Sequence, residues 1–432
     1  NQSITMIVGI LLLVVGLAGA FQEPSALNKK RYDGYKLYST VPTAKSQLDM
    51  LHNMMLNNVH VDFWKEPSHL RRKVEFLVAP QHQIVVATEL RKAGLEFNVK
   101  VEDMQTQLTA MYEDMDRHRA GSPTPHIFGL NKYNTLDEIN QFLSDTAANC
   151  VAPLSCELYS IGSSYEGRPI NAIRIYQEGS DRKGFYIEAT THAREWITTS
   201  TITNIINTLA FRTDADAVRL TDDFDWYLVP VVNVDGYVYT DTNDRLWRKN
   251  RNPVGEACVG VDINRNYNWA WGEDGASHIP CGETYCGPSA GSESETQAVS
   301  AELVRLGPTL AGMVTLHSYG NMWMFPFGNT VNYTGEVCER AADHDELMRV
   351  ADITVTAIEQ TYNTQWDAGN SCEVIYATSG GTNDYAKGVA GIAYTYVPEL
   401  RGESFIVPME QIPEAYRETW NGIIAMAGAV VV

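Results

Sequence analysis

The chain has 432 residues, of which 44% are hydrophobic and 20% are charged, a composition typical of a folded rather than a disordered protein. Its 53 Asp and Glu outnumber its 33 Lys and Arg, which gives a formal net charge of −20. This balance argues against nucleic-acid binding, because binding phosphates needs a basic surface. The length exceeds that of one average core and indicates a large domain with a smaller one.

The chain begins with an apolar run. Residues 4–20 are almost wholly apolar and end in the small triplet Ala-Gly-Ala, which predicts a cleaved secretory signal peptide over residues 1–20. The alternative is an uncleaved membrane anchor, which usually needs about 20 apolar residues. We therefore expect a secreted, extracellular protein without membrane association after signal cleavage.

Residues 21–119 predict a small α+β unit with antiparallel strands. Alternating or clustered apolar residues indicate strands, and helical spacing of apolar residues indicates helices. Strands are expected at residues 74–78 and 83–86, and helices at residues 46–56, 86–93 and 102–118.

The end of this unit carries a basic site. Arg117 and Arg119 precede a stretch rich in Gly and Pro at residues 120–125. Such a stretch is exposed and easily cut by a protease, so we expect a cut near one of these arginines. The alternative is an ordinary linker between domains.

Residues 120–432 alternate between apolar runs and helical patterns. This alternation predicts an α/β fold in which a mixed, mostly parallel central sheet has helices on both faces. Strands are expected at residues 184–189, 226–232, 311–316 and 391–397, and helices at residues 197–209, 292–306 and from residue 416 to the end.

The seven cysteines suit a secreted protein with disulfides. Spacing alone leaves several pairings open. The expected pairs are Cys150 with Cys156, Cys258 with Cys281, and Cys338 with Cys372, which leaves Cys286 unpaired.

Two histidines and a carboxylate follow two of the expected strands. His192 and Glu195 come after the strand at 184–189, and His317 comes directly after the strand at 311–316. Neither pattern is specific alone, since a surface pair or a core histidine would look the same. However, the carboxyl ends of parallel strands in α/β sheets are where ligands bind. The three side chains are thus candidate ligands of a zinc ion.

Other residues near the strand ends could complete a hydrolytic site. Such a zinc site needs three protein ligands, a general base and a cation for the developing oxyanion. Glu399 follows the strand at 391–397, and Arg248 and Arg265 lie in loops. All the necessary residue types are therefore present.

At this point the chain resembles the secreted metallocarboxypeptidases of the carboxypeptidase A/B type. The resemblance covers residues 120–432 as the catalytic domain and residues from about 25 to 119 as an activation segment. The stretches that carry it are His192-Ala193-Arg194-Glu195-Trp196, Arg245-Leu246-Trp247-Arg248-Lys249, residues 260–266, Leu316-His317-Ser318-Tyr319, Ile375-Tyr376 with Ser379-Gly380-Gly381, and Pro398-Glu399-Leu400-Arg401.

The resemblance implies one Zn²⁺ held by His192, Glu195 and His317, with Glu399 as the general base toward a zinc-activated water and Arg248 beside the oxyanion. Substrates would be peptides or proteins with a free C-terminus. Residues expected to bind them are Asn264, Arg265, Tyr376, Arg194, Ser318, Tyr319 and Asn383. Arg265 suits a terminal carboxylate because its planar guanidinium can donate two parallel hydrogen bonds.

In this family one residue at the floor of a pocket selects the side chain of the terminal residue. Asn383 occupies that position and carries no charge to match a basic side chain. We therefore expect neutral terminal residues, apolar or aromatic and also polar, with Met324, Ile375 and Val397 lining the pocket walls. The alternative is a preference for Lys or Arg, if Asp384 turns into the pocket.

Taken together, these features predict a secreted zymogen that a trypsin-like protease activates. We expect a monomer that digests protein in a lumen. The alternative from another class is an inactive, carboxypeptidase-like protein that binds peptide C-termini. The resemblance also implies the Cys258–Cys281 and Cys338–Cys372 disulfides.

Overall fold

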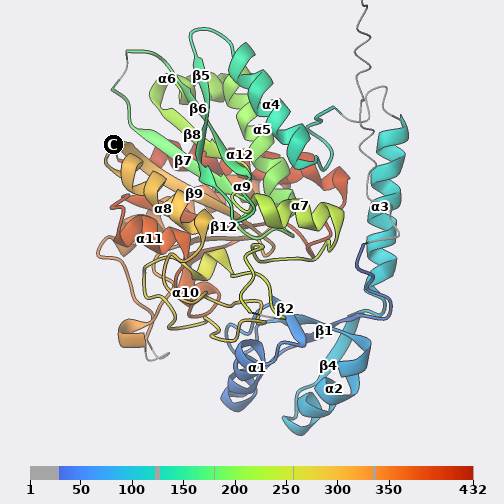
Figure 1. The fold of residues 1–432 in the computed structure, drawn as a ribbon. Coiled ribbons are helices and arrows are strands. Elements are labelled where there is room, and N and C mark those ends of the chain that lie inside the picture. The colour runs from blue at the N-terminus through green and yellow to red at the C-terminus, as the bar shows by residue number, and fades with distance from the viewer. Residues whose placement is uncertain (1–28, 122–126, 180, 256, 334–336, 432) are drawn as a thin grey trace, which may run out of the picture.

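The computed structural model describes residues 29–121, 127–179, 181–255, 257–333 and 337–431 (Figure 1). The expected signal peptide and most of the expected linker after Arg119 lie outside these residues. Among the helices that are described, none is long and apolar enough to cross a membrane.

The described residues form the following elements. The helices are α1 Lys45–Asn57, α2 Gln83–Lys92, α3 Met104–Gly121, α4 Leu136–Asn149, α5 Trp196–Phe211, α6 Ala215–Asp223, α7 Val234–Thr242, α8 Ser294–Leu306, α9 His344–Tyr362, α10 Ser371–Val374, α11 Thr382–Gly388 and α12 Ile412–Ala429. The strands are β1 Lys36–Thr40, β2 Val61–Lys65, β3 Val74–Val78, β4 Phe97–Val101, β5 Ser155–Ser163, β6 Pro169–Tyr176, β7 Gly184–Ala189, β8 Asp225–Val229, β9 Leu310–Ser318, β10 Met322–Phe325, β11 Asp367–Asn370 and β12 Tyr394–Leu400.

Residues 29–121, here called the N-terminal unit, contain an antiparallel sheet in the order β2-β3-β1-β4. One face of the sheet packs on α1 and α2, with Phe76 of β3 among the buried residues of that cluster. The neighbouring Leu77 belongs to a cluster that continues into the rest of the molecule. Because successive strand residues point to opposite faces, the sheet is buried on both sides. Figure 1 shows α3 running beside the larger unit.

The prediction of a strand at residues 83–86 is wrong, because these residues form the first turn of α2. A short helical turn that begins at Pro80 leads the chain directly into this helix. Ile84 and Val85 are 82% and 57% exposed, whereas Val86 and Leu90 are buried, which is the i, i+4 spacing of a helix face. The run of β-branched residues had favoured a strand.

Residues 127–431, here called the C-terminal unit, contain a sheet in the order β11-β10-β12-β9-β7-β8-β6-β5. The pairs β10–β11, β9–β12, β7–β9 and β7–β8 are parallel, and the pairs β10–β12, β6–β8 and β5–β6 are antiparallel. The predicted α/β class with a mixed, mostly parallel sheet is therefore confirmed.

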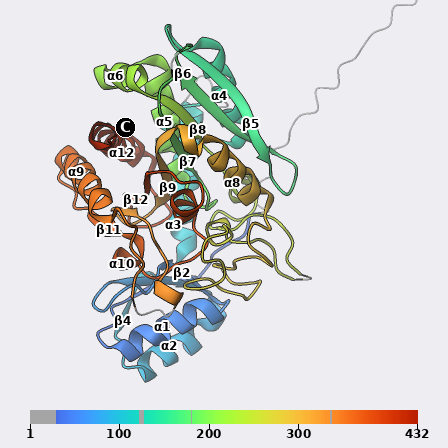
Figure 2. The same cartoon turned by 90° about the vertical axis from the view of Figure 1, so that its left-hand side faces the viewer.

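Helices cover both faces of this sheet. In β7, Phe185 and Ile187 pack in the cluster that contains α5, α9 and α12. Tyr186, which lies between them, packs in the cluster that contains α8 and α11. Figure 2 shows α9 and α12 on the side of the sheet opposite to α8.

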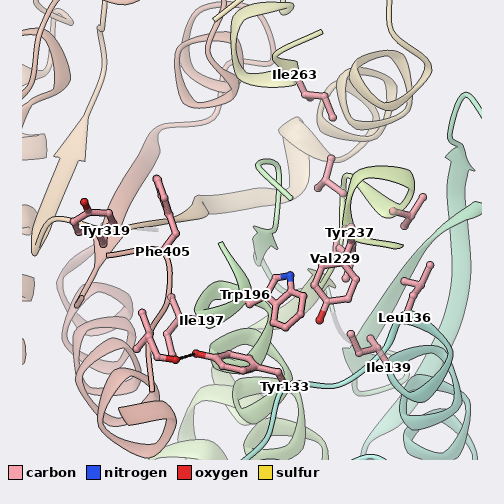
Figure 3. Close-up of a cluster of buried hydrophobic side chains, with 14 of the residues drawn as sticks. Tyr133, Leu136, Ile139, Trp196, Ile197, Val229, Tyr237, Ile263, Tyr319 and Phe405 are labelled. Carbon is pink, nitrogen blue, oxygen red and sulfur yellow. Dashed lines mark hydrogen bonds between the residues drawn. The ribbon is translucent and has the colours of Figure 1, made fainter. Parts of the chain in front are cut away.

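A buried cluster holds the segments that carry the expected site residues (Figure 3). Trp196 and Ile197 follow Glu195 at the start of α5, Ile263 precedes Asn264, and Tyr319 follows Ser318 at the end of β9. Because interiors are closely packed, these neighbours fix the directions in which the site residues point.

Three site residues lie within strands rather than after them. His317 and Ser318 are part of β9, and Glu399 is part of β12. The backbone of Glu399 pairs with that of His317 across these parallel strands. Strands β5, β6, β10 and β11, at the two sides of the sheet, were not expected from the sequence.

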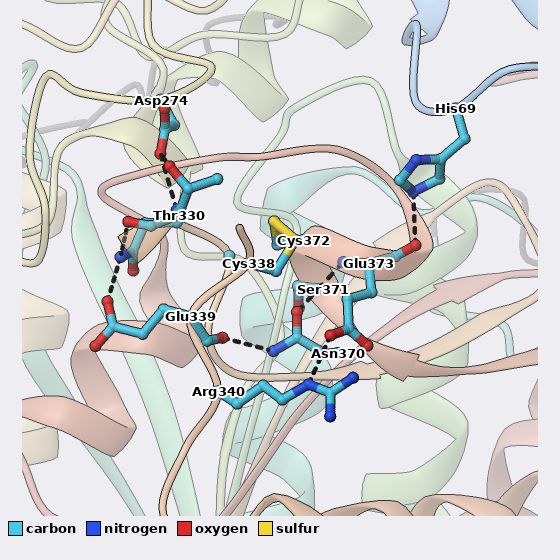
Figure 4. Close-up of a disulfide and its surroundings, with 12 residues drawn as sticks. His69, Asp274, Thr330, Cys338, Glu339, Arg340, Asn370, Ser371, Cys372 and Glu373 are labelled. Carbon is cyan, nitrogen blue, oxygen red and sulfur yellow. Dashed lines mark hydrogen bonds and ion pairs between the residues drawn. A yellow bond between two sulfur atoms is a disulfide. The ribbon is translucent and has the colours of Figure 1, made fainter. Parts of the chain in front are cut away.

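Disulfides join Cys150 to Cys156, Cys258 to Cys281, and Cys338 to Cys372, the same pairs that were expected. Cys286 is a buried free thiol. The Cys338–Cys372 disulfide ties α10 to the segment before α9 (Figure 4). It thereby anchors the chain just before Tyr376.

Candidate active site

The three expected metal ligands meet at one end of the sheet. His192 and Glu195 lie in the turn between β7 and α5, and His317 lies near the end of the neighbouring strand β9. All three side chains are buried. His192 Nδ1 lies 2.8 Å from Glu195 Oε1, and His317 Nδ1 lies 3.1 Å from both Glu195 Oε2 and His192 Nδ1.

These separations fit a single zinc ion. Tetrahedral ligands at about 2.0–2.1 Å from zinc lie about 3.3 Å from one another. The two nitrogens lie 3.1 Å apart, each lies 2.8 or 3.1 Å from an oxygen of the Glu195 carboxylate, and one ligand atom from each residue lies within 4.8 Å of the others. Two imidazoles and a carboxylate also form the donor set of a catalytic rather than a purely structural zinc site.

The charges of this group depend on one another. Burial would raise the pKa of Glu195, but His192 and His317 hold that pKa far below its ordinary value. Burial would lower the pKa of His317, and Glu195 raises it instead. The carboxylate is therefore ionised, as a metal ligand must be.

Asp262 is a site residue that the sequence reasoning missed. Its buried carboxylate lies 3.1 Å from His192 Nε2 and accepts hydrogen bonds from Arg248 Nε and Nη2 at 3.1 and 2.8 Å. A carboxylate behind a ligating histidine fixes its orientation and raises its basicity. The only sequence signal was the position of Asp262 next to Asn264 and Arg265 in one motif.

Arg248 and Glu399 face the same cavity, which has a volume of about 220 Å³. Burial would lower the pKa of Arg248, but Asp262 raises it, so the guanidinium stays charged. Burial and the charge of Glu195 raise the pKa of Glu399 to about 8. The cavity thus contains a cation and a carboxyl group that can exchange a proton. The expected site residues that line it are His192, Glu195, Arg248, Asn264, Arg265, Ser318, Tyr319, Tyr376, Asn383 and Glu399.

Arg265 is held by three hydrogen bonds. It donates from Nε to Gly275 O at 3.1 Å, from Nη1 to Asn264 O at 2.9 Å and from Nη2 to the hydroxyl of Tyr376 at 2.6 Å. The backbone of Gly380 lies directly on that of Arg265, where an added Cβ would come within 2.3 Å of Arg265 O. Gly380 also has a φ of +69°, so glycine is required there for both reasons.

The expected specificity pocket is part of this cavity. Met324, Ile375 and Val397 line it as expected, together with Asn383. Among the described residues, Asn383 Nδ2 has no hydrogen-bond partner although the side chain is buried. Asp384 does not line the cavity, because its Oδ2 accepts from the backbone N–H of Gly328 at 2.9 Å.

The N-terminal unit covers the cavity and contacts some of the side chains that are expected to bind substrate. Arg194 Nη1 donates to Asp62 Oδ2 at 2.7 Å, so this residue faces the N-terminal unit rather than the cavity. The hydroxyl of Tyr319 donates to the buried Glu75 at 3.1 Å, and Lys100 pairs with the same carboxylate at 3.0 Å.

Tyr376 is also held by the N-terminal unit. Its side chain is buried in the cluster formed by α1, α2 and one face of the small sheet, including Met55 and Phe63. Its hydroxyl lies on Arg265, the group expected to bind a terminal carboxylate. Burial raises the pKa of Tyr376, so the phenol remains protonated. The position of Tyr376 therefore blocks part of the Arg265 guanidinium.

Comparisons with known families agree with this site. Residues 139–422 match the family of zinc carboxypeptidases, and residues 38–110 match the carboxypeptidase activation peptide. The chain therefore belongs to the zinc carboxypeptidase family and is a metallocarboxypeptidase with an activation peptide.

Individual relatives cover between 69% and 92% of the chain. Zinc carboxypeptidase A 1 of Anopheles gambiae is 32% identical over 402 residues, which is 92% of this chain and 89% of that protein. Carboxypeptidase B of Astacus astacus is 36% identical over 303 residues, which is 69% of this chain and 97% of that protein. The crystal structure of carboxypeptidase A from Helicoverpa armigera superposes with a TM-score of 0.83 at 28% identity, covering 92% of this chain and 98% of that one.

The contact between Asp262 and His192 yields a first prediction. Asp262→Asn should weaken zinc binding about 10–100-fold, because the histidine loses its charged partner. It should also leave Arg248 without a counter-charge. Competition with a colour-forming chelator measures the affinity, and Asp352→Asn on the exposed face of α9 is the control. An unchanged zinc affinity would contradict the role given to Asp262.

The burial of Asp384 yields a second prediction. Burial raises its pKa from 3.8 to about 7 in the folded protein. Folding therefore takes up a proton between these two values, and stability falls as the pH rises through them. From about pH 5 to about pH 8, wild type should lose about 2–3 kcal/mol relative to Asp384→Asn. Denaturant unfolding of both proteins measures this difference, and parallel pH profiles would show that Asp384 is ionised in both states.

Proposed function

We propose that the chain is the secreted zymogen of a zinc exopeptidase that removes neutral residues from the C-termini of peptides. The observation that carries the proposal is the buried group of His192, Glu195 and His317, which opens on the same cavity as Glu399 and Arg265. A hydrolytic centre and a carboxylate-binding group at one place are what an exopeptidase needs.

The zinc assignment is supported by the donor set and its spacing, as well as by the family. Zinc at this position would supply a Lewis acid that activates water and polarises the scissile carbonyl. Asp262 keeps His192 oriented with its Nδ1 toward the other two ligands. The remaining chemistry belongs to the side chains of the cavity.

Glu399 takes the role of general base and then of general acid. Its half-buried side chain lines the cavity, and desolvation together with Glu195 raises its pKa to about 8, close to the value that favours proton exchange near neutral pH. Arg248 keeps its charge through Asp262 and faces the same space, where it can stabilise a developing oxyanion.

Arg265 takes the role of binding the terminal carboxylate. Its Nε and Nη1 donate to backbone carbonyls, whereas among the described residues its Nη2 donates only to the hydroxyl of Tyr376. A substrate carboxylate would replace that phenol. Asn264, whose Oδ1 accepts from the backbone N–H of Thr382 at 3.0 Å, stands beside it. Arg194, Ser318 and Tyr319 would line the outer part of the cleft.

The preference for neutral residues is supported by the pocket. Its walls are apolar, and its polar group Asn383 has no charge, so a basic side chain would be buried without a partner. The carboxylate of Asp384 accepts a hydrogen bond from the backbone N–H of Gly328 outside the cavity, which argues against the Lys/Arg-specific alternative.

Activation would follow removal of the N-terminal unit, which contacts Arg194, Tyr319 and Tyr376. Arg117 lies on the exposed last part of α3, where a trypsin-like protease could cut at it or at Arg119. The disulfides support an oxidising, extracellular location. We also propose that the activated protein is monomeric and digests protein in a lumen.

The direct test uses the trypsin-treated protein on peptides that differ only in the last residue. We expect release of neutral terminal residues, and loss of that release when a chelator removes the metal. Glu399→Gln should retain zinc but lose at least about 100-fold in kcat. Zinc binding with no release of any residue would instead favour the inactive peptide-binding alternative.

The pocket assignment yields a further prediction. Asn383→Asp should raise kcat/KM for C-terminal Lys or Arg by about 10-fold or more, because a buried charge pair replaces an unpaired cation. It should lower activity on neutral residues. Asp384→Asn is the matched control and should leave the preference unchanged. If wild type already prefers Lys or Arg and Asp384→Asn loses that preference, the B-type alternative is correct.

A further inference from the structure

We propose a second processing site within the N-terminal unit, at the loop that joins β2 to β3. The proposal rests on the proposed activation by a trypsin-like protease and adds where that protease cuts. The loop spans residues 66–73, between Lys65 at the end of β2 and Val74 at the start of β3. Three consecutive residues of this loop, Arg71, Arg72 and Lys73, are basic.

The basic residues are accessible. Residues 69–73 are all exposed, with Leu70 at 44% and the side chain of Arg72 at 57%. Within the described part of the chain, no hydrogen bond or ion pair is found for the side chains of Arg71 and Lys73. A protease that recognises Arg or Lys can therefore reach these side chains without unfolding the sheet.

The loop has few contacts of its own to lose. The ring of His69 lies 2.6 Å from the carbonyl oxygen of Glu373 on α10 (Figure 4). Arg72 pairs with Asp367 at 3.0 Å, and both partners are more than half exposed. An exposed ion pair of this kind contributes little to stability, because water screens both charges. The backbone N–H of Arg71 donates to Pro42 O at 2.7 Å, and that of Arg72 donates to His69 O at 3.2 Å. The carbonyl oxygen of Pro67 contacts the ring of His52, and Arg72 and Lys73 stand at the rim of the cavity.

By comparison, Arg117 and Arg119 lie inside α3, which extends to Gly121. A protease binds its substrate as an extended strand, so the last turn of α3 must unwind before either arginine fits. Residues 66–73 contain no helix, so only the turn at residues 70–71, in which Arg71 has a φ of +66°, must straighten to fit. The loop is therefore at least as good a substrate as the end of α3.

The cut is an ordinary peptide hydrolysis by the activating protease. The bond between Arg71 and Arg72, or between Arg72 and Lys73, breaks. The carbonyl carbon takes the hydroxyl of one water, and the amide nitrogen takes the hydrogen and leaves as a new N-terminal amine.

The sheet order determines the effect of this cut. In the order β2-β3-β1-β4, strands before the cut alternate with strands after it, so one cut leaves the sheet assembled. After a further cut at the end of α3, two separate peptides hold the sheet together. The first carries Asp62, which contacts Arg194, and the second carries Glu75, which contacts Tyr319. Only non-covalent strand pairing then joins the two peptides, so once the pairing of β1 and β2 with β3 and β4 is lost, the contact with Arg194 and the contact with Tyr319 need not break together.

The test is a timed trypsin digestion of the full-length protein, followed by mass measurement of the fragments. We expect a fragment that begins at Arg72 or Lys73 to appear no later than the cut at Arg117 or Arg119. An N-terminal unit that is released as one uncut piece would overturn the proposal. The masses are independent of peptidase activity, so a failure here leaves the proposed function to its own assay.

Three variants make the test specific. Arg71→Gln/Arg72→Gln/Lys73→Gln should lack the loop fragment and regain activity several-fold more slowly, whereas Arg91→Gln/Lys92→Gln, in the last turn of α2, should behave as wild type. Equal activation of these two variants would overturn the proposal.

Asp367→Asn removes the ion pair of Arg72 but keeps the cut site, so the fragment should appear at least as fast as in wild type. Loss of the fragment in this variant would also overturn the proposal.

Discussion

The site depends on the contact among His192, Glu195 and His317, three ionisable side chains buried within 3.1 Å of their neighbours. Burying such groups is costly unless each has a partner. Here the histidines hold Glu195 ionised, and Asp262 satisfies the far side of His192 while keeping Arg248 charged. A cation bound by these three side chains would offset the remaining cost of burying them, which is why the arrangement suits zinc.

The N-terminal unit covers this site with polar contacts as well as apolar ones. Asp62 accepts a hydrogen bond from the guanidinium of Arg194, and Glu75 accepts one from the hydroxyl of Tyr319. The apolar cluster around α1 and α2 holds Tyr376 against Arg265. These are the groups that we propose bind a peptide substrate. On that proposal, the same buried contacts stabilise the N-terminal unit on the cleft and would keep substrate from binding.

Much of the fold and the site could be predicted from the sequence, because strong local patterns and a specific set of motifs agreed. The predicted α/β class is confirmed, and the expected ligands lie together. Residues 83–86 were misassigned because β-branched residues favour strands, and only tertiary packing of Val86 and Leu90 shows the helix. Asp262 was missed because its role depends on two distant partners, which no local pattern reveals.

The most direct test of the central claim is the metal content of the purified full-length protein. Elemental analysis should find one zinc per chain, and His317→Ala should reduce that content to a small fraction, because two ligands bind zinc far more weakly than three. A purified chain without zinc, or a His317→Ala variant that keeps all of it, would contradict the account.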